Sequence, residues 1–165
     1  MASKKGILVT IIILAVITSA SFLLWAIPEN NETTFVVSDY EGYYLGVKNI
    51  QEVLQESINI EYQNLRNGDI TPQEYVAVTD VTTSQVTAQI SEFVTSKPAE
   101  KWQDSYISYM DAMKKFNSYV VETKVLANLI ENGDSETEMN ETIEKIESLK
   151  AEYLELVKNS ENLQP

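Results

Sequence analysis

Apolar and polar positions divide the chain into one long apolar run and a longer stretch in which apolar residues recur every three or four positions. Residues 6–27 are uncharged and mostly apolar, and they show no polar face. A helix over this run would be about 33 Å long, which is enough to cross the hydrocarbon core of a bilayer. We therefore expect a single transmembrane helix over residues 6–27.

The residues that flank this run predict its orientation. Lys4 and Lys5 precede it, and the charged residues that follow it closely, Glu29 and Glu32, are both acidic. Because lysines beside a membrane helix stay on the cytoplasmic side, residues 1–5 should lie in the cytoplasm and the remainder outside. Trp25 stands where an interfacial aromatic anchor would sit. The chain is thus predicted to be a single-pass plasma-membrane protein with an extracytoplasmic domain.

A cleaved signal peptide is the main alternative for the same run. Residues 18–21 are small, as a signal peptidase requires. The apolar run continues over residues 22–27, so cleavage there would leave an apolar end on the mature protein. Apolar cores of signal peptides are about 7–15 residues long, which favours an uncleaved anchor.

Gly6, between Lys5 and Ile7, offers another alternative. A short basic leader, a glycine and an apolar helix resemble the processing site of type IV pilin precursors. The resemblance covers a short N-terminal stretch and implies a mature chain that begins at Ile7 and assembles into a filament. Pilins often carry a glutamate early in the mature helix, where this chain has Ile11 and Ile12.

The rest of the chain contains four stretches with helical periodicity, separated by turn signals. A serine or threonine followed three residues later by glutamate predicts a helix start at Ser38, Thr71 and Ser135. Asn-Gly pairs predict helix ends after residues 66 and 131. We expect a polar connector over residues 28–37, a domain over 38–160 with helices over about 38–66, 72–95, 98–131 and 136–159, and a tail over 161–165.

The third stretch has the strongest pattern, and the second has the weakest. The apolar positions of the third stretch alternate strictly between spacings of four and three, as in a heptad seam. These positions are Trp102, Tyr106, Tyr109, Met113, Phe116, Val120, Thr123, Ala127 and Ile130. The second stretch is rich in β-branched residues, which would also suit a strand. We favour a helix there because no turn signal interrupts residues 72–96.

Short connections force neighbouring helices to run antiparallel. The predicted fold is therefore all-α, with a single N-terminal transmembrane helix followed by an antiparallel up-down four-helix bundle. This layout resembles the four-helix-bundle sensor domains of bacterial and archaeal chemoreceptors and sensor kinases, over roughly residues 6–159. Such receptors also need a second transmembrane helix and a cytoplasmic output region. No second apolar run follows residue 27, so the resemblance does not extend to direct signalling.

Charge narrows the range of partners. The chain has a formal net charge of −13, and all 25 acidic residues follow Pro28. This excess repels nucleic-acid phosphates and anionic lipid headgroups, so no nucleic-acid partner is expected. Solvation, cations or a basic partner fit better. The last predicted helix is the most acidic, which is typical of a solvated face and would also suit divalent cations.

The absence of two residue types limits the catalytic and metal-binding sites that the chain can form. The chain has no cysteine and no histidine. Cysteine nucleophiles, Ser-His-Asp triads and histidine-ligated metal sites are therefore excluded. We expect no enzymatic activity and no cofactor. An extracytoplasmic domain without disulfides fits a prokaryotic cell envelope better than a small secreted animal domain.

Two kinds of candidate site remain. Trp102, Tyr106 and Tyr109 would line a ligand pocket between helices, although the same spacing is typical of plain core. Asn31 and Asn140 each begin an Asn-Glu-Thr triplet, which matches the N-glycosylation acceptor pattern.

These observations favour a non-enzymatic, single-pass membrane-anchored interaction module. It would serve as an accessory subunit of a membrane complex or as an envelope scaffold, with the bilayer and other membrane or envelope proteins as partners and a homo-oligomer as an option. One alternative is a sensor-type module that binds a small ligand or cation and works with a separate signalling chain. The other is a type IV pilin-like filament subunit.

Overall fold

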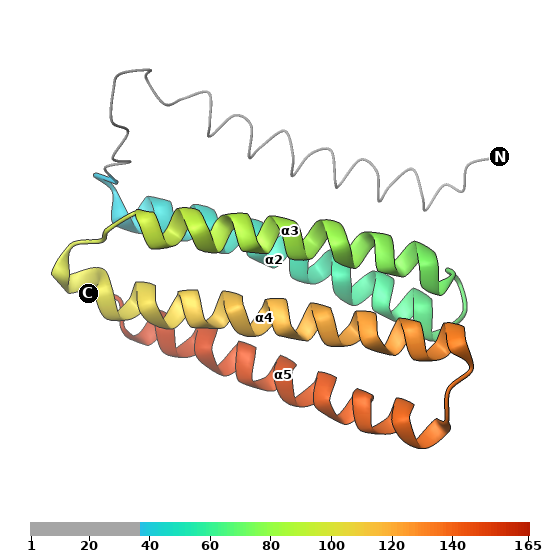
Figure 1. Cartoon of the computed structure of the whole chain (residues 1–165). Helices are drawn as coiled ribbons and strands as arrows, with labels where there is room; N and C mark the ends of the chain where they lie inside the picture. The colour runs from blue at the N-terminus through green and yellow to red at the C-terminus, as the bar shows by residue number, and fades with distance from the viewer. Residues whose placement is uncertain (1–36) are drawn as a thin grey trace. The chain divides into compact units, whose positions relative to one another are not determined.

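The computed structural model describes residues 37–165. The expectations for the membrane run 6–27, for Lys4, Lys5 and Trp25 beside or within it, and for Asn31 lie outside the described residues. The described part forms four helices, α2 (Tyr40–Arg66), α3 (Pro72–Thr95), α4 (Glu100–Asn132) and α5 (Glu136–Asn162) (Figure 1). None of them combines the length and the apolar character that a membrane crossing needs.

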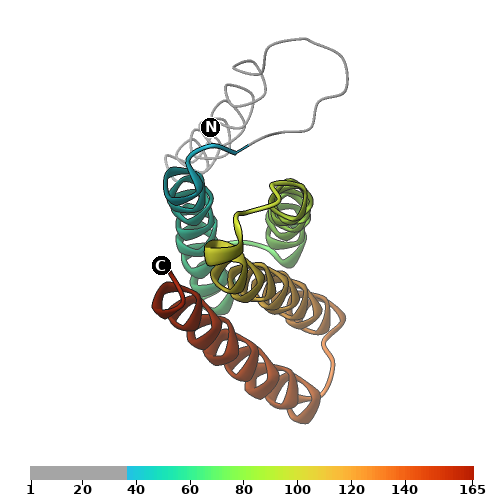
Figure 2. The ribbon, with the colours of Figure 1, turned by 90° about the vertical axis from the view of Figure 1, so that its left-hand side faces the viewer.

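The helices pack antiparallel to their neighbours in sequence, which confirms the predicted all-α four-helix bundle (Figure 1). The start of α2, the α3–α4 link and the end of α5 gather at one end of the bundle, which we call the near end. Seen along the bundle, α4 lies between the other helices (Figure 2). It packs against all three, and its contacts with α3 and α5 are the most extensive in the bundle.

Local capping fixes where three of the helices begin. Thr71 and Ser135 each form a reciprocal capping box with the glutamate three residues later. α2 begins differently from the expectation, because Asp39 rather than Ser38 caps it. The Asp39 carboxylate accepts a hydrogen bond from the Gly42 amide at 2.9 Å. A Cβ atom at position 42 would come within 2.3 Å of that carboxylate, so a larger residue there would require the Asp39 side chain to move from this position.

The α3–α4 link has no comparable cap. α4 begins at Glu100, two residues beyond Pro98, and its N-cap Ala99 makes no side-chain hydrogen bond. Lys97, in the same link, has a φ of 43°, and it is the one non-glycine residue with a positive φ among residues 37–165. Because a side chain at positive φ is strained, this link is held by its surroundings rather than by local preference.

The buried side chains agree closely with the predicted apolar positions on α4 and less closely on α2. On α4, every predicted seam position is buried except Ile130, which is 36% exposed. On α2, the apolar pattern of the sequence places Tyr43 and Ile50 on the same face as Leu54. In the structure these two residues are only half-buried, whereas Tyr44 and Gln51 are buried. α5 buries few side chains, and they recur every seven residues: Ile146, Tyr153 and Ser160.

Removal of a cap should destabilise the bundle measurably. Ser135→Ala removes the hydroxyl that accepts a hydrogen bond from the Glu138 amide. We expect it to lower the free energy of unfolding by about 0.5–2 kcal/mol, as measured by urea denaturation. Thr87→Ala is the matched control, because within residues 37–165 this exposed hydroxyl bonds only to the Thr83 carbonyl of its own helix. Equal losses in the two variants would contradict a capping role for Ser135.

Candidate interaction surfaces

The predicted pocket residues form part of an aromatic cluster at the near end. Trp102, Tyr106 and Tyr109 of α4 surround Tyr44 of α2, with ring centroids 6.4, 6.0 and 4.9 Å from that ring. All four side chains are buried. The Tyr106 hydroxyl donates a hydrogen bond of 2.7 Å to the Tyr40 carbonyl. The arrangement thus joins the start of α2 to α4.

Burial also sets the protonation of this cluster and of the core below it. It raises the pKa of Tyr109, and in α3 it raises the pKa of Tyr75. Burial, together with the Glu92 charge, raises the pKa of Tyr43 to about 12. These phenols therefore stay neutral across the physiological range.

Stability should consequently fall at alkaline pH. A phenol whose pKa is raised in the folded state stabilises that state fully below the unfolded pKa of 10.0, and this contribution is lost as pH rises above it. We expect cooperative unfolding above pH 10. In a pH titration, tyrosinate absorbance should increase over the same pH range in which the helical circular dichroism signal is lost. Tyrosinate absorbance that rises fully while the helical signal stays constant would contradict this prediction.

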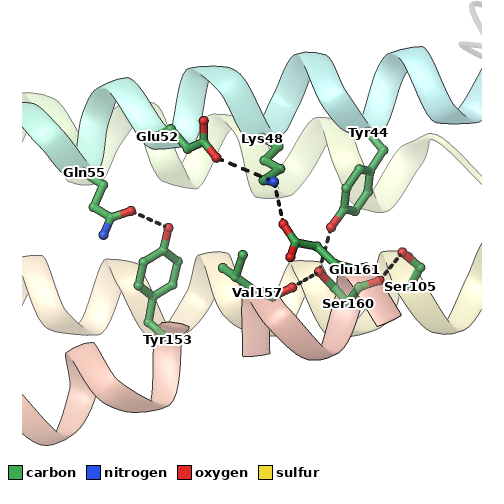
Figure 3. Close-up of polar contacts among 9 residues, drawn as sticks. All are labelled: Tyr44, Lys48, Glu52, Gln55, Ser105, Tyr153, Val157, Ser160 and Glu161. Carbon is green, nitrogen blue, oxygen red and sulfur yellow. Dashed lines mark hydrogen bonds and ion pairs between the residues drawn. The ribbon is translucent and has the colours of Figure 1, made fainter. Parts of the chain in front are cut away.

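Polar side chains bridge α2 and α5 (Figure 3). The Ser160 hydroxyl donates to the Val157 carbonyl at 2.7 Å, so the Tyr44 hydroxyl donates to Ser160 Oγ, also at 2.7 Å. Ser105 of α4 donates to the Ser160 carbonyl at 2.9 Å. Since its own proton is engaged by the backbone, Ser160 serves as a structural junction between three helices.

Two further polar contacts join α2 and α5, and together with the Tyr44–Ser160 bond we call them the α2–α5 polar seam (Figure 3). Tyr153 donates a hydrogen bond of 3.0 Å to the Gln55 side chain. Lys48 forms ion pairs with Glu161 and Glu52, and the hydrogen bond to Glu161 raises the Lys48 pKa. The seam therefore holds α5 to α2 through directional polar contacts.

The seam makes a testable contribution to stability. Tyr44→Phe keeps the ring and removes the hydroxyl that bonds to Ser160. We expect a loss of about 0.5–1.5 kcal/mol in the free energy of unfolding, measured by urea denaturation. Tyr40→Phe is the matched control, because the Tyr40 hydroxyl makes no hydrogen bond within residues 37–165. Indistinguishable stabilities of the two variants would argue against the buried bond.

A shallow apolar hollow of about 350 Å³ lies between the end of α3 and the start of α4. We call it the α3–α4 groove, and it is lined by Phe93, Val94, Lys97, Pro98, Gln103, Tyr106, Ile107 and Met110. Phe93 and Tyr106 are buried and stacked, with centroids 4.3 Å apart, so they form its floor. Val94 and Ile107 are 57% and 54% exposed, the highest values among the large hydrophobic residues described.

The outer face of α3 beside this groove has little charge. No charged residue occurs from Val81 to Ser91. Asp80, just before this stretch, is paired with Lys124 of α4 at 2.6 Å. Among the residues that line the groove, Lys97 is the one charged residue. Glu92 precedes Phe93, and Asp104 and Asp111 lie one turn to either side of Ile107 on α4. The groove lining and this face thus carry little charge, on a strongly acidic chain.

Other predicted features lie along α5. Asn140 is exposed within the helix, although an acceptor triplet is expected on a surface loop. Within residues 37–165, no three acidic side chains come together in a way that could hold a metal ion. Two lysines form ion pairs between α4 and α5, Lys145 with Glu122 and Lys115 with Glu152.

Sequence reasoning named one residue that lines the α3–α4 groove, Tyr106, and missed the other lining residues. The pattern singled out apolar residues that share a seam, whereas Val94 and Ile107 lie off the seams of their helices. An apolar residue outside the helical period is a weak signal alone, because single exposed hydrophobics are common. The groove becomes visible only when the end of α3 is placed beside the start of α4.

Comparison with protein-family models, with curated proteins and with solved structures gave no match. The fold therefore rests on the structure itself, and function has to be argued from its surfaces.

Proposed function

We propose that this chain is a non-enzymatic, single-pass membrane-anchored interaction module, acting as an accessory subunit of a membrane complex or as an envelope scaffold. The observation that carries the proposal is the α3–α4 groove, where Val94 and Ile107 expose more than half of their surface to water. Clusters of apolar side chains on a solvent-exposed face are typical of protein interaction sites.

The location of the groove supports this proposal. It lies at the near end, where residue 37 leads into α2 (Figure 1). With residues 6–27 as the anchor, the connector over residues 28–37 reaches at most about 35 Å. The groove therefore lies at the end of the bundle through which the chain would join the anchor, which suits contact with neighbouring membrane proteins.

The charge distribution supports the same proposal. α5 alone carries eight acidic residues, whereas the groove and the outer face of α3 are nearly neutral. Acidic faces keep the domain solvated and away from anionic headgroups. A neutral face lets a protein partner approach without that repulsion, which suits an interaction module.

Affinity capture from crosslinked native membranes tests the proposal. Full-length chain is compared with Val94→Glu/Ile107→Glu and with Leu154→Glu, a matched change at a residue of α5 that is 46% exposed. We expect a defined set of membrane or envelope proteins, or a second copy, to be captured with wild type and Leu154→Glu and to be lost with the double variant. Equal capture by all three chains would overturn the role of the groove.

The same samples test the anchor. Mass spectrometry of the mature N-terminus should find Met1 or Ala2 when the anchor is uncleaved. A chain that begins at Ile7 would support the pilin-like filament alternative instead.

A second candidate function is a sensor-type module for a small polar ligand. It is favoured by Gln51, which is fully buried in the bundle and whose two amide atoms make no hydrogen bond within residues 37–165. Such an amide could bind a polar guest. A thermal-shift screen of amino acids, sugars and divalent cations tests this candidate, and a uniform absence of shifts would remove it.

A further inference from the structure

We infer that the α3–α4 groove binds the same groove of a second copy of this chain, so that two copies form a parallel dimer about a two-fold axis. The parallel orientation rests on the membrane anchor of the proposed function. The contact itself rests on the charge, exposure and position of the described residues.

Charge selects the occupant of the groove. Residues 1–36 hold two lysines and two glutamates, so the net charge of −13 falls on residues 37–165. Two such domains repel each other across most of their surfaces. The groove and residues 81–91 are the exception, because they bring no excess of like charge together. A basic partner would be attracted to the acidic face of α5, whereas a neutral apolar groove suits another neutral apolar groove.

The exposure pattern is self-complementary. Val94 and Ile107 project on the exposed side of a hollow whose floor is the Phe93–Tyr106 stack. A two-fold axis places the same patch on both partners, so the projecting side chains of each copy can enter the hollow of the other. Each copy then buries its two most exposed apolar side chains.

The anchor fixes the register of the contact. With the anchor of the proposed function, the chain of each copy would enter its bundle at the near end from the same membrane, which favours a parallel pair. Groove therefore meets groove, and confinement to the membrane raises the effective concentration of one copy around another. An antiparallel pair whose bundles overlap along their full length would separate the two grooves by the length of the bundle.

Cysteine crosslinking of the full-length chain in native membranes tests this inference. The chain has no cysteine, so a single substitution gives an unambiguous reporter. Val94→Cys and Ile107→Cys would lie near the two-fold axis, and a disulfide requires Cα atoms within about 7 Å. Leu154→Cys on α5 is the matched exposed control. Tagged and untagged copies are expressed together, so that a dimer of this chain is identified by both forms.

We expect oxidation to convert Val94→Cys and Ile107→Cys into a disulfide-linked dimer of doubled mass, and to leave Leu154→Cys monomeric. Equal dimer fractions at all three positions would indicate random collision and overturn the inference. Adducts of the groove cysteines with a different protein would overturn it as well and leave the proposed function standing. Absence of any adduct at both groove positions would count against both.

A second measurement does not depend on disulfide geometry. Light scattering in mild detergent compares wild type with Val94→Glu/Ile107→Glu and with Leu154→Glu. Facing glutamates should raise the dimer dissociation constant by about tenfold or more. Since all three positions are exposed, the variants should keep the wild-type melting temperature, and circular dichroism checks that they do. A wild-type dimer that persists in the groove variant would contradict the inferred interface.

Discussion

Phe116→Ala should lower the free energy of unfolding by about 3–5 kcal/mol, the largest single loss we expect in this bundle. Phe116 is fully buried on α4. Its ring lies 5.2 Å from that of Tyr153 on α5 and 5.8 Å from that of Tyr119. Truncation removes apolar surface and leaves a cavity in the helix that touches all the others, so α5 and α4 lose packing together.

Urea denaturation followed by circular dichroism measures this loss. Val121→Ala on the same helix is the matched control, because Val121 is 45% exposed and should change stability little. Small domains have free energies of unfolding of about 5–15 kcal/mol, so the alanine variant can be partly unfolded without denaturant. Phe116→Leu then supplies a smaller step in the same direction. A change below about 1 kcal/mol in the alanine variant would contradict the tight packing of this position.

Gln51→Leu should have the opposite effect and raise the free energy of unfolding by about 1–3 kcal/mol. Gln51 is fully buried on α2, and neither its amide nitrogen nor its amide oxygen is hydrogen-bonded within residues 37–165. An unpaired amide in an apolar core bears its full desolvation cost, whereas leucine of similar size bears none. A single core substitution that stabilises a protein is uncommon, which makes the test sharp.

Gln55→Leu, one turn further along α2, is the matched control. The Gln55 side chain accepts a hydrogen bond from Tyr153, so its replacement should leave that hydroxyl unpaired and destabilise the bundle. Opposite signs for the two substitutions would support the distinction between a paired and an unpaired amide. A loss of stability in Gln51→Leu would show that Gln51 has a partner in solution, and would favour the ligand-binding candidate.

The seam of α4 could be predicted closely, because this helix packs against all three others and its burial follows its own period. Trp102, Met113 and Phe116 are buried as the heptad pattern indicates. The pattern of α2 was a poorer guide. A polar residue such as Gln51 is assigned to the surface by any rule based on side-chain polarity, yet the geometry of the bundle buries it.

The contacts between helices could not be predicted from the chain alone. Ser160 looks like an ordinary surface serine, and it is buried because Tyr44 and Ser105 reach it from two other helices. The exposure of Val94 and Ile107 likewise depends on where the α3–α4 link places the two helix ends. Such features are set by the packing of distant segments, which local periodicity does not record.

The Tyr44–Ser160 bond joins residues that are 116 positions apart in the chain. The helix pairs α3–α4 and α4–α5, by contrast, are joined by short links, so they can form at little cost in loop-closure entropy. The α2–α5 polar seam should therefore form late, after the transition state for folding. Substitutions in the seam should accelerate unfolding and leave the refolding rate nearly unchanged. The seam would thus determine the unfolding rate, and with it the lifetime of the folded domain.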